Sequence, residues 1–165
     1  MKKSSPTPLD RIDHRLLAQL QADSGRTLEA LGDAVGLSPS AVQRRIARYR
    51  AEGLMLRQVA VLDPGRFDGV VLATVFVTLE QESVALHRAF QERMRAAPEV
   101  QQCYDLAGSR DYLVIIATTG MRNSREVVDR LFMTDPNIKR FDTHFVFTAV
   151  KTGLALPTRA GDAEG

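Results

Sequence analysis

The residues whose types and spacing suggest chemistry are a serine, a glutamine and several arginines between Ser38 and Tyr49. At helical spacing, one stripe of this segment is apolar: Val42, Ile46 and Tyr49. The opposite face then carries Ser40, Gln43, Arg44, Ala47 and Arg48. Guanidinium groups can bond guanine bidentately and amides can bond adenine, so this face is suited to reading bases in duplex DNA. Arg45, at the edge of the apolar stripe, is expected to contact phosphate or to pack.

Two short helices joined by a tight turn would position these side chains. The first helix carries Leu28, Leu31 and Val35, and Gly36 ends it because glycine readily adopts the left-handed conformation. Ser38 is expected to cap the second helix, with Pro39 at its first position. This order predicts a helix-turn-helix that lies in the major groove. The alternative is an ordinary helical hairpin with a solvated basic face.

A preceding helix completes a small three-helix domain. Asp10 can cap that helix, with Asp13 in its first turn, and Gly53 stops the last helix. We therefore expect a flexible arm at residues 1–8 and a DNA-binding domain at 9–53. Residues 1–62 hold ten Lys and Arg against six Asp and Glu, and this local positive charge also favours double-stranded DNA as a partner.

The second half of the chain has a different pattern. Residues 54–62 alternate weakly, so 54–69 are predicted to be a linker that is partly a strand, with a turn at Asp63-Pro64-Gly65. Strands are then expected at 71–79, 100–106, 112–118 and 138–150, with helices at 86–97 and from Asn123 or Ser124 to about 134. This βαββαβ order is ferredoxin-like and occupies residues 70–157, before a flexible tail at 158–165. One sheet face is left uncovered and apolar, which favours dimerisation.

Composition narrows the class of protein. The chain has 165 residues, of which 44% are hydrophobic and 25% charged, and it has neither a membrane-length apolar run nor a signal peptide. The single Cys103 excludes an intramolecular disulfide and a cysteine-based zinc site. A cytoplasmic location, with no membrane partner, is therefore expected.

Four motifs in order resemble the Lrp/AsnC family of transcription regulators. They are Leu9-Asp10-Arg11-Ile12-Asp13, Val35-Gly36-Leu37-Ser38-Pro39-Ser40, the stretch from Gly108 to Val114, and the stretch from Val150 to Pro157. The resemblance covers residues 9–157. It implies an α+β fold, with an N-terminal helix-turn-helix (winged-helix-like) domain followed by a ferredoxin-like βαββαβ domain. It also implies sequence-specific DNA binding and a homodimer that assembles into a tetramer or octamer.

The resemblance further implies a site between dimers for a small effector, an amino acid or a related metabolite. At matching positions the site residues are Gly108, Asp111, Tyr112, Met121, His144, Phe145 and Val146. The chain departs from the family at Ser109 and Arg110, since an acidic residue usually follows the glycine. Asp111 could bind the ammonium group, loop amides beside Gly108 or Arg110 the carboxylate, and Met121 and Phe145 the side chain. The alternative is that Asp111 only caps the turn before Tyr112.

Two other functions remain open at this stage. A small ferredoxin-like enzyme fused to a helix-turn-helix would need catalytic groups, and His144 with Asp142 is the one pair that could be a base and its orienter. No nucleophile, metal-ligand spacing or phosphate loop accompanies this pair, so neither catalytic residues nor a cofactor is expected. His14 and His87 are expected to be solvated on helix surfaces. An architectural DNA-binding protein without an effector is the second alternative.

Overall fold

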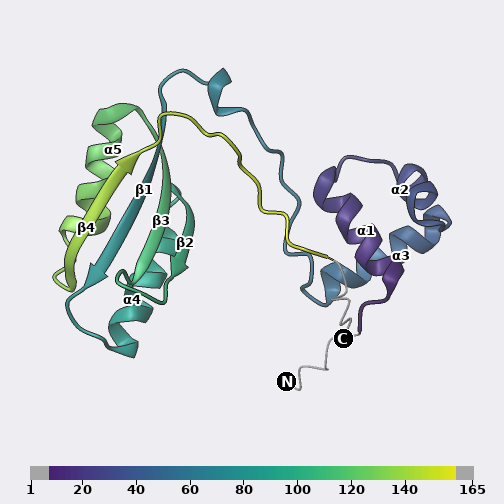
Figure 1. Cartoon of the computed structure of the whole chain (residues 1–165), viewed down its shortest axis with the longest axis horizontal. Coiled ribbons are helices and arrows are strands. Elements are labelled where there is room, and N and C mark those ends of the chain that lie inside the picture. The colour runs from purple at the N-terminus through teal and green to yellow at the C-terminus, as the bar shows by residue number, and fades with distance from the viewer. Residues whose placement is uncertain (1–7, 159–165) are drawn as a thin grey trace. The chain divides into compact units, whose positions relative to one another are not determined.

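The computed structural model describes residues 8–158, so the predicted flexible arm and tail fall almost entirely outside the described residues. The chain divides after Val61 and again after Lys151 (Figure 1). Residues before Leu62 form the first unit together with those from Thr152 on, and Leu62–Lys151 form the second. Within the described range, no helix combines the length and apolar character needed to cross a membrane.

The first unit contains three helices, α1 (Arg11–Ala22), α2 (Leu28–Val35) and α3 (Pro39–Ala51). Side chains cap each of them: Asp10 accepts from the Asp13 N–H, Thr27 from the Ala30 N–H, and Ser38 from the Ala41 N–H. The apolar stripes pack together in one core: Leu16, Leu20, Leu31, Val35, Val42, Ile46 and Tyr49. The helix-turn-helix predicted from periodicity is confirmed.

The turn between α2 and α3 depends on two glycines. Gly36 has a φ of 77°, and the N–H groups of Gly36 and Leu37 both donate to the Gly32 carbonyl. Gly32 packs so closely that a Cβ there would lie 2.4 Å from the Leu37 carbonyl oxygen. The sequence predicted the role of Gly36, whereas that of Gly32 depends on a contact that no local pattern reveals.

The predicted strand in the linker is not formed. Residues 56–63 are in neither a helix nor a strand, and a 3-10 turn, η1 (Pro64–Arg66), follows them. The side chains of Leu56 and Val61 are 89% and 85% exposed. Their alternation indicated a strand, but the described chain supplies no neighbouring strand for a hydrogen-bonded ladder.

The second unit has the ferredoxin-like order. Its elements are β1 (Val70–Leu79), α4 (Val84–Ala96), β2 (Val100–Asp105), β3 (Tyr112–Thr119), α5 (Gly120–Val128), the π-helical turn η2 (Asp129–Met133) and β4 (Ile138–Phe145). All neighbouring strands are antiparallel, in the order β2-β3-β1-β4. The predicted α+β class and βαββαβ arrangement are confirmed.

The two faces of this sheet differ. Alternate residues such as Val75 and Val114 are fully buried with residues of α4, α5 and η2, including Phe90 of α4 and Leu131 of η2. The opposite face is partly exposed, and its apolar side chains come from the two central strands: Leu72, Phe76, Leu113, Ile115 and Ala117. On β4 the same open face carries Arg140, Asp142 and His144.

Two predicted boundaries are wrong. The helix after β3 begins at Gly120, whose φ of 81° lets the chain turn without a loop, and Asn123 instead bonds back to the Thr119 N–H. The last strand ends at Phe145, not at residue 150, because the last bond of its ladder with β1 joins the Val146 N–H to the Leu72 carbonyl.

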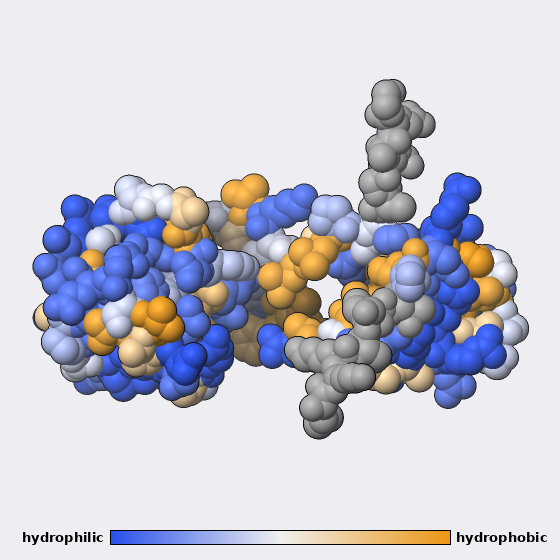
Figure 2. Space-filling view, turned by 90° about the horizontal axis from the view of Figure 1, so that it is seen from below, coloured by the Kyte–Doolittle hydropathy of each residue, from blue (hydrophilic) through white to orange (hydrophobic). Residues whose placement is uncertain are grey.

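The segment after β4 was predicted to belong to the ferredoxin-like domain up to residue 157. From Thr152 on, the contacts of this segment group it with the first unit. The Gln21 side chain on α1 donates to the Leu156 carbonyl at 3.0 Å and accepts from the Leu156 N–H at 2.7 Å. Apolar side chains remain exposed along this segment and along the linker, where Figure 2 shows orange surface: Leu56, Val59, Val61, Phe147, Val150 and Leu154.

Candidate DNA interface and effector site

The face of α3 that was predicted to read DNA is open to solvent. Ser40, Gln43, Arg44 and Ala47 are exposed, while Val42, Ile46 and Tyr49 are buried against α1 and α2. Ser38 is exposed at the start of the helix, and its hydroxyl lies 3.2 Å from that of Ser40. The arrangement therefore presents an amide, a guanidinium and two hydroxyls on one side of a capped helix.

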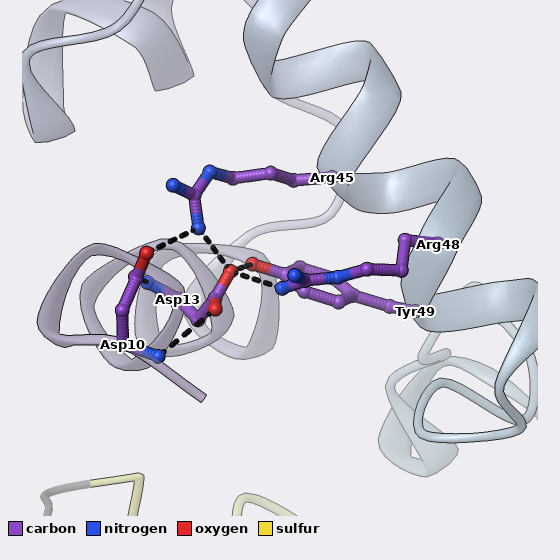
Figure 3. Close-up of polar contacts among 5 residues, drawn as sticks. All are labelled: Asp10, Asp13, Arg45, Arg48 and Tyr49. Carbon is purple, nitrogen blue, oxygen red and sulfur yellow. Dashed lines mark hydrogen bonds and ion pairs between the residues drawn. The ribbon is translucent and has the colours of Figure 1, made fainter. Parts of the chain in front are cut away.

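The guanidinium groups of Arg45 and Arg48 do not belong to this open face. Both guanidinium groups bind the same carboxylate oxygen of Asp13, at 2.5 Å from Arg45 and 2.6 Å from Arg48 (Figure 3). Arg45 also lies 2.9 Å from Asp10. Arg48 was predicted on the free outer face, but it turns toward the N-terminal end of α1, where the buried Asp13 carboxylate requires cationic partners.

Asp13 is the electrostatic centre of this cluster. Its side chain is 1% exposed, and it also accepts a 2.5 Å hydrogen bond from the Tyr49 hydroxyl. Burial by itself raises the pKa of Asp13, but hydrogen bonds from Tyr49, the Asp10 N–H and the two arginines outweigh it and hold that pKa well below its usual range. Burial and the same carboxylate raise the pKa of Tyr49. The sequence indicated only that Asp13 suits a first helical turn.

In the second unit, Asp111 fastens the loop before β3 to the end of β1. Its carboxylate accepts from the Leu79 N–H at 2.6 Å, and its own N–H donates to the Val77 carbonyl at 2.9 Å. The following residue, Tyr112, is 1% exposed on the helix-covered face. The Tyr112 hydroxyl lies 2.6 Å from Nδ1 of His87 and 3.1 Å from the side-chain amide of Gln91. Asp111 thus has a structural role, but its side chain ties the loop to β1 across 32 positions and does not simply cap the turn before Tyr112.

Arg110, one of the two departures from the family pattern, lies on the open sheet face. Its guanidinium is 2.8 Å from Asp142 and 3.3 Å from the Thr78 hydroxyl. Arg140 also binds Asp142, and hydrogen bonding from Arg140, with the charge of Arg110, lowers the pKa of that carboxyl. The other departure, Ser109, is exposed beside Gly108.

Three of the four remaining predicted effector residues lie toward the other end of the sheet, whereas His144 pairs with Thr74 midway along β1. Met121, the second residue of α5, is 58% exposed, and Phe145 and Val146 are 41% and 38% exposed. His144 packs edge-on against Phe76, with ring centroids 6.0 Å apart. Tyr112 and Thr119, the first and last residues of β3, are seven steps apart, about 23 Å at the rise of a strand. One chain therefore does not bring the nine predicted residues into one pocket.

Comparison with known proteins matches both halves of the chain to domains of one family. Residues 9–50 match the AsnC-type helix-turn-helix domain, and residues 72–156 match the Lrp/AsnC ligand binding domain. The chain belongs to the Lrp/AsnC family.

Individual relatives agree with this assignment over nearly their whole length. An "Uncharacterized HTH-type transcriptional regulator y4tD" from Sinorhizobium fredii is 35% identical over 149 residues, which cover 90% of this chain and 88% of the relative. The "DNA-binding transcriptional activator DecR" from Escherichia coli is 30% identical, covering 90% and 98%. A transcriptional regulator from Neisseria meningitidis, solved as a complex with L-Met, has a TM-score of 0.78 at 28% identity and covers 91% and 97%.

Lrp/AsnC proteins are DNA-binding transcriptional regulators and not enzymes, which decides against the enzyme alternative. Asp142, the proposed orienter of His144, is engaged instead by Arg110 and Arg140. His87 is not simply solvated as expected, because it bonds both Tyr112 and Glu82. Among residues 8–158, no group of three or more His, Cys, Asp and Glu side chains is placed to hold a metal ion.

Proposed function

We propose that this Lrp/AsnC regulator reads its operator with the exposed face of α3. Gln43 and Arg44 contact base edges in the major groove. Ser38 and Ser40, at the start of α3, donate hydrogen bonds to the sugar-phosphate backbone of the DNA. The observation that supports this most is the clean division of α3 between a buried stripe and an exposed polar face. An amide and a guanidinium on adjacent positions can each make a bidentate bond to a purine.

Binding to DNA selected from a random pool tests this docking face. Arg44→Ala is expected to cost about 1–3 kcal/mol of binding free energy and to relax the preference at one base position, measured by fluorescence anisotropy. The matched control is Arg88→Ala, which removes the same exposed side chain from α4 in the second unit. If Arg44→Ala bound the selected DNA as the control does, a different surface would contact the operator.

We also infer that the open sheet face packs against the same face of a second copy. The face offers a strip of apolar side chains from β1 and β3 next to charged residues of β4, and a self-complementary patch produces a two-fold dimer. Such a dimer would present two recognition helices to successive major grooves. Dimers would then join into a tetramer or octamer.

The effector in this proposal is an amino acid or a related metabolite that binds between dimers. The residues from Gly108 to Tyr112 and those around Met121 and Phe145 lie toward opposite ends of one sheet, so they could form a single site only across two chains. The match to a ligand-binding domain and the L-Met complex of a similar regulator support a small amino-acid-like ligand.

A thermal-shift screen against single amino acids tests the effector proposal. A ligand at about 100 times its Kd stabilises the folded state by about 2.7 kcal/mol, which raises the melting temperature measurably. Met121→Glu is expected to abolish that shift. Met133→Glu is the control, because Met133 is 67% exposed in η2 but is not a predicted site residue. Equal shifts in both variants would place the ligand elsewhere.

A ligand between dimers acts on DNA binding by favouring one assembly or orientation over another. The coupling free energy is then roughly 1–3 kcal/mol and reciprocal, so operator DNA changes effector affinity by the same factor. An architectural protein without an effector would show no amino-acid-dependent melting shift and no such linkage.

A further inference from the structure

The cluster at the N-terminal end of α1 is electrically balanced although it lies in a DNA-binding unit. Two arginines, Arg45 and Arg48, are paired with two carboxylates, Asp10 and Asp13 (Figure 3). An incoming phosphate would therefore meet no net positive charge here. Lys and Arg side chains supply the phosphate contacts of DNA-binding proteins, so the presence of both carboxylates beside these arginines needs an explanation.

The two carboxylates differ in how firmly they are held. Asp13 is 1% exposed and receives Tyr49, Arg45 and Arg48 on one oxygen. The Asp10 side chain is 53% exposed, and its Oδ2 contacts Arg45 alone, at 2.9 Å. Its other oxygen, Oδ1, accepts the Asp13 N–H at 2.7 Å and so caps α1. Hence another anion can replace Oδ2 of Asp10 beside Arg45 without loss of the cap. The buried Asp13 carboxylate, by contrast, stays bound to both arginines.

The place of these arginines on α3 brings them next to the reading face. At 100° per residue, Arg48 lies about 40° from Arg44 around the helix and Arg45 about 100° from it, on the same side. The two guanidinium groups thus flank the face that carries Gln43 and Arg44. When a recognition helix occupies the major groove, the sugar-phosphate backbone runs along such a flank.

We propose that Arg45 exchanges Asp10 for a DNA phosphate when the protein binds DNA, while Asp13 holds both guanidinium groups in place. Asp13 is then a positioning residue. Asp10 is a competitor that occupies the phosphate site in the free protein and weakens binding to every sequence equally, because phosphate contacts carry no base information. The inference rests on the proposed docking of α3, which Arg44→Ala tests separately.

The decisive variant is Asp10→Asn, since asparagine keeps an oxygen for the cap and caps helices as well as aspartate does. The matched control is Asp23→Asn at the other end of α1. It makes the same change of charge, and Asp23 likewise accepts a local N–H, that of Gly25. Binding is measured with the full chain on selected and on unrelated duplexes. Asp10→Asn is expected to bind both about three- to tenfold more tightly than Asp23→Asn at low salt.

The same two substitutions made in an Arg45→Gln variant show whether Asp10 acts through Arg45. Arg45→Gln is expected to reduce the slope of log affinity against log salt by about 0.9, the value for one phosphate contact. In that background, Asp10→Asn and Asp23→Asn should have equal effects. The exchange is overturned if Asp10→Asn matches its control in the unaltered chain, or if its advantage persists in full without Arg45. Loss of affinity in Arg44→Ala together with either result would leave the docking face intact and refute only the exchange.

Discussion

Removing the charge of Asp13 should destabilise the helical unit more than any other single carboxylate-to-amide change in it. In Asp13→Asn, the Arg45 and Arg48 guanidinium groups lose their shared anion. Breaking a buried ion pair costs about 3–5 kcal/mol. Arg45 and Arg48 remain 22% and 30% exposed, so water compensates in part, and asparagine keeps one acceptor. We therefore expect a loss of about 2–3 kcal/mol in the free energy of unfolding.

Such a loss is large for a unit of this size, because about 50 residues contribute only about 3–8 kcal/mol in total. Urea unfolding followed by circular dichroism measures the loss, and amide hydrogen exchange shows whether it is confined to α1–α3. Asp33→Asn on the exposed side of α2 is the control, expected within about 0.5 kcal/mol of the original chain. A cost for Asp13→Asn as small as that of the control would refute the reasoning.

Two further measurements examine the mechanism of this loss. Tyr49→Phe removes the hydroxyl that donates to Asp13 and should cost about 1–2 kcal/mol alone, but less when combined with Asp13→Asn, because both act on one network. Acid gives the second measurement. The pKa of Asp13 is lowered in the folded state, so its contribution is complete above about pH 4 and is lost as pH falls toward the folded value. The difference in the free energy of unfolding between the original chain and Asp13→Asn should therefore shrink below pH 4. A constant difference on acidification would contradict the role assigned to Asp13.

Three other outcomes are expected. Gly32→Ala should lower the melting temperature of the helical unit, because the new Cβ meets the Leu37 carbonyl oxygen at 2.4 Å, whereas Gly153→Ala, with nothing within 4 Å, should not. Phe76→Glu, on the open sheet face, should shift sedimentation toward the monomer, while Val84→Glu on α4 should not; a dimeric Phe76→Glu would move the interface elsewhere. Asp111→Asn should remove the amino-acid-induced melting shift yet keep the effector-free melting temperature nearly unchanged, because asparagine still accepts from the Leu79 N–H; a full shift would remove Asp111 from the site.

The local architecture could be predicted from the sequence where short-range physics decides it. The caps at Asp10, Thr27 and Ser38 depend on hydrogen bonds three residues apart, and the buried stripes follow from helical or strand periodicity. The sheet order then follows from the βαββαβ pattern, since such folds place the first and third strands at the centre. The caps and the stripes are visible in any window of a dozen residues, and the sheet order follows once the elements are placed in sequence.

Features that depend on distant residues could not be predicted in this way. The pairing of Asp13 with Arg45 and Arg48 spans 32 and 35 positions, so periodicity placed Arg48 on a free surface that it does not occupy. The linker alternates as a strand does, but a strand also needs a neighbour. The two hydrogen bonds between the Gln21 side chain and the Leu156 backbone span 135 positions, and no local pattern predicts them.

The candidate effector site shows the same division between local and long-range information. The loop from Gly108 to Asp111 was recognised by its motif, but its carboxylate is tied to the Leu79 N–H, and its arginine to Asp142 on β4. An ammonium group could therefore reach only the second oxygen of Asp111 and would meet the Arg110 cation close by. The exchange of the usual acidic residue for Ser109, followed by Arg110, thus makes this loop less favourable for a cation than a doubly acidic loop. The remaining oxygen of Asp111 is then the single anionic partner that this loop offers to the ammonium group of a ligand, and its charge is what Asp111→Asn removes.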